Sequence, residues 1–195
     1  MFSVRTHAEQ QFARYLDIFP EEAAGLKALA AQLQDPADIF VRSNMTGHIT
    51  TSSLVYDRST DMVLTVFHKL YRRELQPGGH QEGDGLLSES ANRENGEETG
   101  VTDAQLHRWH QEFDAPFDID THPIPAQPQK NEGEHLHHDF IYLFSADSTK
   151  PLTPQLSEVE VARWIPRKAF GALPGKRFQR LVAKLSGLIE AGFFD

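Results

Sequence analysis

The stretch GGHQEGDGLLSESANRENGEETGV, residues 78–101, decides how the rest of the chain is interpreted. Its last third carries Glu94, Glu97 and Glu98, which share one face of a helix because residues three and four apart are neighbours on a helix surface. Carboxylates on one face repel one another unless a cation lies between them. Arg93 is spaced to reach Glu97 at i+4 and to hold that carboxylate in place. The pattern predicts a helix that gathers acids for a hard divalent cation such as Mg²⁺, which prefers oxygen ligands.

The same segment resembles the signature of the Nudix hydrolase family, G-x5-E-x7-R-E-U-x-E-E-x-G-U, in which U is an aliphatic residue. Seven residues stand at the signature spacing: Gly79, Arg93, Glu94, Glu97, Glu98, Gly100 and Val101. Two positions depart from it, because Gly85 occupies the place of the first glutamate and Asn95 that of the first aliphatic residue. A match of this length is a specific signal, and the flanking chain is similar to the family over about residues 45–170.

The resemblance implies a fold, a cofactor and a reaction. The fold is an α/β/α sandwich of the α+β class, a mixed sheet between helices, to which this chain adds an N-terminal helical extension. Glu94, Glu97 and Glu98, with the carbonyl of Gly79, are implied to bind Mg²⁺ or Mn²⁺. Arg93, Glu97 and Glu98 are implied to act in catalysis. The implied reaction hydrolyses the pyrophosphate bond of a nucleoside diphosphate linked to another moiety.

Two alternatives stay open at this point. A solvated acidic helix is the first, since Asn95-Gly96 is a turn signal and glycine costs about 0.8–1.0 kcal/mol relative to alanine inside a helix. Against it, the Gly78-Gly79 pair and Gly100 frame a loop–helix–loop unit. The second alternative concerns activity: the departures from the signature favour a module that binds a nucleotide or a metal as a sensor without turning it over. An isomerase on the same scaffold is a weaker option.

Length and composition favour one globular domain. The 195 residues, 39% hydrophobic and 24% charged, are enough to bury a core. We therefore expect a single domain over 1–195, with a helical extension at 1–40, a core at 45–170 and a C-terminal helix at 174–192.

The charge balance restricts the partners. A net charge of −9 argues against broad binding to nucleic acid or to anionic membranes, which need basic surfaces. It leaves room for a small-molecule nucleotide or other diphosphate substrate, because a bound cation inverts the local field. The chain has no cysteine and no run of about 20 apolar residues, so we expect no disulfide, no thiol nucleophile and a cytoplasmic location.

The N-terminal region predicts two helices. The first covers Thr6–Ile18, with Thr6 and Glu9 in capping-box spacing. The second starts at Pro20 and ends at Asp35-Pro36. This pair is expected to pack on the sheet; the alternative is a contact in a homodimer.

The core begins with a predicted hairpin. His48–Tyr56 is rich in β-branched residues and is followed by a turn and the strand MVLTVFHKL, residues 62–70. Arg72 and Arg73 come next and lead into the glycine pair of the signature. An arginine side chain can bind phosphate oxygens in bidentate fashion. We take both as candidate substrate-binding residues; surface solubility is the competing explanation.

A histidine-rich strand is predicted over residues 135–144, HLHHDFIYLF. Alternation places His135, His137 and Asp139 on one face. Three interpretations are open for this face: a wall of the substrate site, a hydrogen-bonded structural edge, or a transition-metal site.

The remaining segments are read from local pattern. Residues 103–113 are ambiguous between strand and helix, although the family resemblance implies a strand, and 116–128 is Pro-rich and predicted to be an irregular loop. A strand is expected over 158–166, and an amphipathic helix over 177–191.

The strand over 158–166 has two features of its own. Val159 and Val161 are expected on the face opposite Glu160, by alternation. Glu158 and Glu160 are candidate acids of the site, or simple solvent-facing positions.

Overall fold

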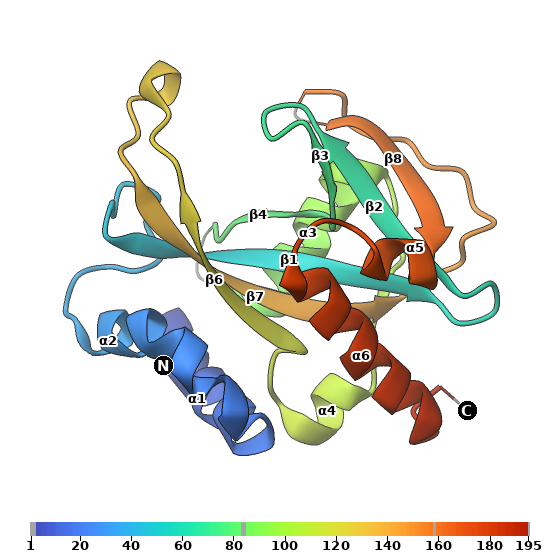
Figure 1. Ribbon diagram of the computed structural model, residues 1–195, viewed down its shortest axis with the longest axis horizontal. Helices are drawn as coiled ribbons and strands as arrows, with labels where there is room; N and C mark the ends of the chain where they lie inside the picture. The colour runs from blue at the N-terminus through green and yellow to red at the C-terminus, as the bar shows by residue number, and fades with distance from the viewer. Residues whose placement is uncertain (1–2, 83–84, 158, 195) are drawn as a thin grey trace.

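The computed structural model describes residues 3–82, 85–157 and 159–194 and contains a mixed β-sheet between helices (Figure 1). This confirms the predicted α/β/α sandwich of the α+β class. The strands of the described residues are β1 (Gly47–Asp57), β2 (Met62–His68), β3 (Arg73–Leu75), β4 (Gly78–His80), β5 (Gln105–Leu106), β6 (Asp118–Ile124), β7 (His135–Ser145) and β8 (Val159–Pro166).

Strands β1 and β7 form the parallel centre of the sheet. The order is β3-β2-β1-β7-β5, with β4 added to β1, β6 to β7 and β8 to β2. The pairing of β1 with β7 is parallel and runs from Gly47 opposite Leu136 to Tyr56 opposite Ser145. All the other pairings are antiparallel. The β1–β2 pair confirms the predicted hairpin.

Helices cover both faces of the sheet. They are α1 (Val4–Ile18), the 3₁₀ helix η1 (Pro20–Leu26), α2 (Lys27–Gln34), α3 (Leu87–Thr99), α4 (Trp109–Phe113), the 3₁₀ helix η2 (Pro128–Lys130), α5 (Arg167–Gly171) and α6 (Lys176–Glu190). In the described part of the chain, no helix has the length and apolar character that crossing a membrane requires.

Side-chain alternation divides the core into two layers. Val55, Phe140 and Tyr142 pack with α1, α2 and α3 on one face. Leu54 and Ile141, one residue out of phase, pack with α4 and α6 on the other. Figure 1 shows α6 in front of the sheet and α3 behind it. The apolar stripe predicted for the C-terminal helix is confirmed by the burial of Phe178, Leu181 and Leu185.

The first N-terminal helix forms as predicted, with a different cap, whereas the single second helix predicted from Pro20 is divided into η1 and α2. The first helix starts at Val4, and Ser3 caps it by accepting a hydrogen bond from the backbone N–H of Thr6. The capping box expected at Thr6 and Glu9 is therefore wrong, since Thr6 already lies within the helix. The pair packs against the sheet, as expected; a role in a homodimer stays a prediction, as does the division of the chain into domains.

Helix α3 continues through Asn95 and Gly96 despite their turn propensity. Asn95 is fully buried, and its Nδ2 donates to the carbonyl of Val101 at 2.8 Å. Gly100 adopts a left-handed conformation, φ 80°, and its N–H closes the helix on the carbonyl of Gly96. The buried amide ties the helix end to the following chain, a link that the aliphatic residue of the signature does not make.

Two local predictions about the strands are corrected. The segment 116–128 is not an irregular loop, because it contains β6, which pairs with β7 along the whole strand. Pro123 is tolerated since β6 is an edge strand there. Residues 103–113 form neither one strand nor one helix but a short β5 followed by α4.

Strand β8 also departs from simple alternation. Its register against β2 shifts between Phe67 and His68. As a result Val161 is 41% exposed, while Ala162 packs with Val159 in the core. The prediction that Val159 and Val161 share a face is wrong for this reason.

A buried polar network joins α1, β6 and α6. Arg180 pairs with Asp118, whose side chain is fully buried, at 2.6 Å, and Lys184 reaches the same carboxylate at 2.6 Å. Tyr15 donates its hydroxyl proton to that carboxylate at 3.2 Å. These contacts fix α6 against the edge strand, and with it Arg177 at the start of the helix.

Candidate functional site

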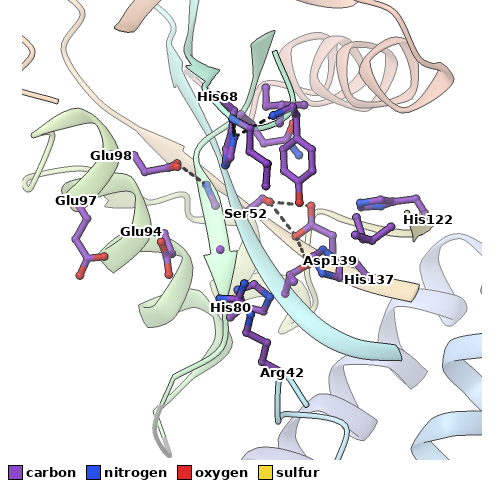
Figure 2. A pocket seen from close by; sticks show the side chains of 18 of the residues that line it. Arg42, Ser52, His68, His80, Glu94, Glu97, Glu98, His122, His137 and Asp139 are labelled. Atoms are coloured by element: carbon purple, nitrogen blue, oxygen red, sulfur yellow. Dashed lines mark hydrogen bonds between the residues drawn. The ribbon is translucent and has the colours of Figure 1, made fainter. Parts of the chain in front are cut away.

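A cavity of about 330 Å³ collects most of the residues predicted for the site. Figure 2 shows the acids of α3 on one side of β4, and Ser52, Asp139 and His137 on the other. The predicted residues that line the cavity are Arg73, Gly79, Arg93, Glu94, Glu97, Glu98, His135, His137 and Asp139. Helix α3 and strands β3, β4 and β7 thus bring together residues that lie up to 66 positions apart, from Arg73 to Asp139.

Glu98 is fixed by the backbone of β4. Its carboxylate is buried, 6% exposed, and accepts a hydrogen bond from the N–H of Gly78 at 2.9 Å. This contact orients one oxygen-bearing side chain toward the glycine pair of the signature.

Glu94 lies directly under the bare Cα of Gly79. A Cβ at position 79 would come within 2.5 Å of the Glu94 carboxyl carbon, so the close approach requires glycine. Burial raises the pKa of Glu94, and the charge of Arg93 only partly opposes this shift. A buried carboxylate with an incompletely balanced charge is well suited to a cation ligand.

Arg93 links two of the acids. Its guanidinium donates to Glu97 at 3.0 Å and to Glu94 at 2.7 Å, which confirms the predicted i+4 pair with Glu97. It also donates to the carbonyl of His80 at 3.3 Å. Glu97 is half-exposed, with 50% of its side chain accessible. The arrangement contradicts a freely solvated acidic helix, since Glu94 and Glu98 are turned inward.

The predicted face of β7 is confirmed, and Asp139 is its most buried member. The Asp139 carboxylate accepts hydrogen bonds from the hydroxyls of Ser52, at 2.8 and 2.9 Å, and Thr50, at 3.3 Å. Arg177 from α6 lies 3.8 Å away. Burial raises the pKa of Asp139 against the opposing charge of Arg177.

Histidines from three further positions join this face. His48 on β1, His80 on β4 and His122 on β6 each have a ring within 5.8 Å, centroid to centroid, of the ring of His137. Sequence reasoning missed these three, as it missed Arg177. Alternation along β1 places His48 with Thr50 and Ser52, and this was the available signal.

Two candidate residues lie elsewhere. Arg72 does not line the cavity; its side chain is 72% exposed and pairs with Glu160 at 3.2 Å. That pairing also places Glu160 on the surface strand rather than among the acids of α3. Glu158 lies outside the described residues.

A protein-family model described as the NUDIX domain matches residues 47–184 of the chain. The chain belongs to the NUDIX domain family. It is accordingly a Nudix-type pyrophosphohydrolase, a class that uses a divalent metal ion. No curated protein sequence matches the chain.

Solved structures of Nudix proteins share the fold. An Ap4A hydrolase from C. elegans is 13% identical, with a TM-score of 0.53, over 73% of this chain and 98% of its own. A NUDIX-family hydrolase from Clostridium perfringens is 21% identical, with a TM-score of 0.53, over 72% and 97%. The E. coli dihydroneopterin triphosphate pyrophosphohydrolase is 13% identical, with a TM-score of 0.52, over 69% and 91%. At these identities the likeness concerns the fold alone.

The acids of the Nudix segment fit a hard divalent cation. Their donors are carboxylate oxygens, the type that Mg²⁺ and Mn²⁺ prefer. The space under Gly79 is filled by the Glu94 carboxylate, and Glu98 is held within the same cavity wall. The residues present therefore fit the metal that the family uses.

Proposed function

We propose that this protein is an Mg²⁺-dependent hydrolase that cleaves the pyrophosphate bond of a nucleoside diphosphate linked to another moiety. The observation that carries the proposal is the position of Glu94 beneath Gly79, inside the cavity lined by Glu97 and Glu98. These three glutamates, with the Gly79 carbonyl, would hold the metal; Mn²⁺ is the other cation that suits the same oxygen donors.

Each residue of α3 has a distinct role in the proposed reaction. When bound, Mg²⁺ supplies Lewis-acid polarisation of the phosphate oxygens and lowers the pKa of a water ligand. Arg93 positions Glu94 and Glu97 through its two hydrogen bonds. Glu97 or Glu98 accepts the proton of the attacking water.

The opposite wall of the cavity is proposed to bind the substrate. His135, His137 and Asp139 present hydrogen-bonding groups there, and Arg73 adds a positive charge. Arg72 remains a candidate only if its exposed side chain leaves Glu160. Two of the similar structures are an Ap4A hydrolase and a dihydroneopterin triphosphate pyrophosphohydrolase, names that specify substrates with a chain of phosphates. Such substrates agree with the proposed class, a nucleoside diphosphate linked to another moiety, for which we propose a cytoplasmic setting.

A substrate panel tests the proposal. Nucleoside diphosphate sugars, dinucleoside polyphosphates, ADP-ribose, NADH, CoA and nucleoside triphosphates are incubated with the full chain, with and without Mg²⁺, and phosphate products are measured. Glu97→Gln should remove most Mg²⁺-dependent turnover while the protein stays folded by circular dichroism. Glu112→Gln, an exposed acid on α4 outside the cavity, is the matched control and should match the wild type. An unchanged rate in the Glu97 variant would sink the proposal.

A sensing role is the second candidate. It is favoured by Gly85, which leaves the position of the first signature glutamate without a carboxylate. The same panel separates the two: binding of a nucleotide with no turnover of any substrate favours the sensor, whereas Mg²⁺-dependent release of phosphate products favours the hydrolase.

A further inference from the structure

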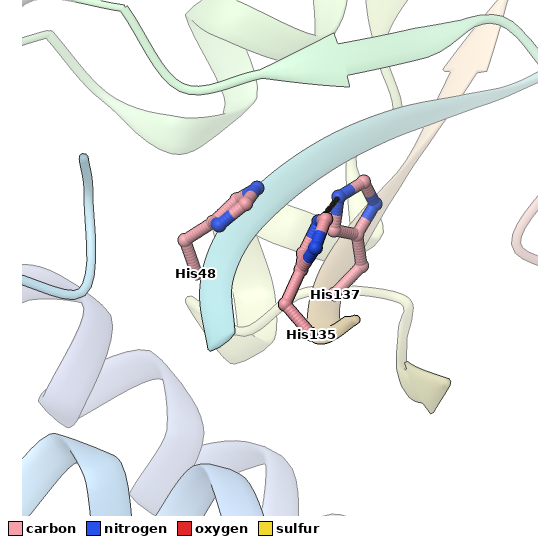
Figure 3. Close-up of side chains that lie close together, drawn as sticks. All are labelled: His48, His135 and His137. Atoms are coloured by element: carbon pink, nitrogen blue, oxygen red, sulfur yellow. Dashed lines mark hydrogen bonds between the residues drawn. The ribbon is translucent and has the colours of Figure 1, made fainter. Parts of the chain in front are cut away.

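Three histidines, two of which line the cavity, lie close together. His48 comes from β1, and His135 and His137 come from the start of the neighbouring strand β7 (Figure 3). Each offers one ring nitrogen such that the three atoms lie within 4.8 Å of one another. Among the described residues, no other group of three or more histidine or acidic side chains meets this criterion. The carboxylates of α3 do not meet it either, since Glu97 turns to Arg93 and Glu98 to the β4 backbone.

Backbone carbonyls fix the tautomers of two of the rings. Nδ1 of His48 lies 3.2 Å from the carbonyl oxygen of Asn44, and Nδ1 of His135 lies 2.8 Å from that of Gly133. A carbonyl only accepts hydrogen bonds, so in both rings Nδ1 carries the hydrogen and Nε2 carries the lone pair. Metal-binding histidines are commonly oriented in this way by a carbonyl on the far ring nitrogen.

The lone pair of His48 has nothing to bind within the described protein. Its residue is 1% exposed, and its Nε2 is buried without a hydrogen-bond partner. Nε2 of His135 lies 3.2 Å from Nε2 of His137, and both residues line the cavity. Buried polar atoms in folded proteins are normally satisfied, so an unpartnered acceptor in a group of three histidines whose ring nitrogens lie within 4.8 Å of one another indicates a missing partner.

We propose that His48, His135 and His137 bind a divalent transition-metal ion of the zinc class. Three neutral imidazoles suit Zn²⁺, Co²⁺ or Ni²⁺, whereas Mg²⁺ prefers oxygen. A site with three histidines leaves a fourth ligand position open. Because His135 and His137 line the cavity, an ion held by these rings would lie beside the space proposed for the substrate.

This site is separate from the acids of α3. Strand β4 divides them, since Gly79 faces Glu94, while the ring of the next residue, His80, lies 5.1 Å from that of His48, centroid to centroid. The donors differ as well, nitrogen on one side of β4 and oxygen on the other. The two sites therefore share no metal ligand, and Zn²⁺ binding and Mg²⁺-dependent hydrolysis are measured separately, so either proposal can fail without the other.

Titration of the full chain with Zn²⁺ in saturating Mg²⁺ tests the proposal. Isothermal calorimetry should give one equivalent of tightly bound Zn²⁺, and Co²⁺ should give the intense visible bands of a low-coordinate site. His48→Asn and His135→Asn should each weaken Zn²⁺ binding by about 100-fold or more. His122→Asn is the matched control, because its ring lies 5.8 Å from that of His137 and it belongs outside the three. Glu97→Gln should also bind Zn²⁺ like the wild type.

A measurement on the wild type covers the case in which a variant fails to fold. Long-range ¹H–¹⁵N spectra of the imidazoles should report Nε2 lone pairs on His48 and His135 before Zn²⁺, and a shift of those nitrogens on addition of one equivalent. Absence of Zn²⁺ binding, or histidine variants that bind like the wild type, would overturn the site and leave a substrate wall as its role. Loss of Zn²⁺ binding in Glu97→Gln would place the ion among the acids instead and would equally overturn it.

Discussion

Adding a single methyl group at Gly79 tests the position of the Glu94 carboxylate. An alanine Cβ there would lie 2.5 Å from Cδ of Glu94 and 2.6 Å from both carboxylate oxygens. Non-bonded carbon atoms are in optimal contact at about 3.5–4.0 Å, so the carboxylate must move by about 1 Å or more. A displacement of about 1 Å of a positioned group costs on the order of 100-fold in rate. We therefore expect Gly79→Ala to lower Mg²⁺-dependent kcat/KM by about 100-fold, or about 2.7 kcal/mol.

The fold should survive this change, because the obstructing atoms belong to the end of a flexible side chain. Gly78→Ala gives the contrasting result: its Cβ would meet the backbone carbonyl of Thr51 at 2.6 Å and Cα of Ser52 at 2.9 Å, which cannot rotate away. That variant should lose stability in urea denaturation. Gly133→Ala, with no heavy atom within 4 Å of the added carbon, should behave as the wild type in both assays.

The assay is steady-state hydrolysis of the best substrate from the panel, at saturating Mg²⁺, with folding checked by urea denaturation of each variant. A Gly79→Ala enzyme that is fully folded and within about two-fold of the wild-type kcat/KM would refute the reasoning, since Glu94 would then tolerate displacement.

Two further predictions concern stability. Arg180→Met should lower the free energy of unfolding in urea by about 3 kcal/mol, the lower end for a broken buried pair, because Lys184 still contacts the same carboxylate. Arg14→Met, which removes an exposed ion pair, should change the free energy of unfolding by less than about 1 kcal/mol. Equal losses of stability in the two variants would contradict the importance of burial. Burial holds the pKa of His110 at about 4, below its ordinary 6.5, so the unfolded chain binds the proton more readily between these values. Stability should therefore fall by about 3 kcal/mol for this group as pH drops from about 6.5 to 4, and His110→Gln should show a shallower pH dependence in urea denaturation. An equally steep loss in the variant would contradict the assignment.

Local pattern predicted those parts of the fold that depend on neighbours in the sequence. The alternation of His135, His137 and Asp139 is a property of one strand, and the structure confirms it. The partners of that face, such as His48, depend on the parallel register of β1 with β7, which joins residues 89 positions apart, His48 and His137. No short-range pattern specifies such a register. The sequence therefore predicted that His135 and His137 share a face, but not that His48 lies beside them.

Predictions from composition were wrong where pairing between distant strands determined the local structure. The prolines around β6 indicate a loop, but an edge strand needs only one row of backbone hydrogen bonds, and β7 supplies it. Asn95 is the opposite case, since it counts as a departure from the signature by residue type. In the structure it is a buried residue whose amide satisfies the Val101 carbonyl, so a polar link replaces an apolar contact at the end of α3.

Strand β4 lies between the two proposed metal sites. It pairs with β1 so that Gly79 lies opposite Thr51 and His80 opposite Thr50, and successive residues of a strand point to opposite faces. Because Gly79 has no side chain, Glu94 from α3 can lie against one face of the strand. The ring of His80 lies next to the histidine rings on the other face. A strand of only three residues thus separates the glutamates of α3 from His48, His135 and His137. Because both faces open to the same cavity, a phosphate chain bound there would pass between a site suited to magnesium and a site suited to zinc.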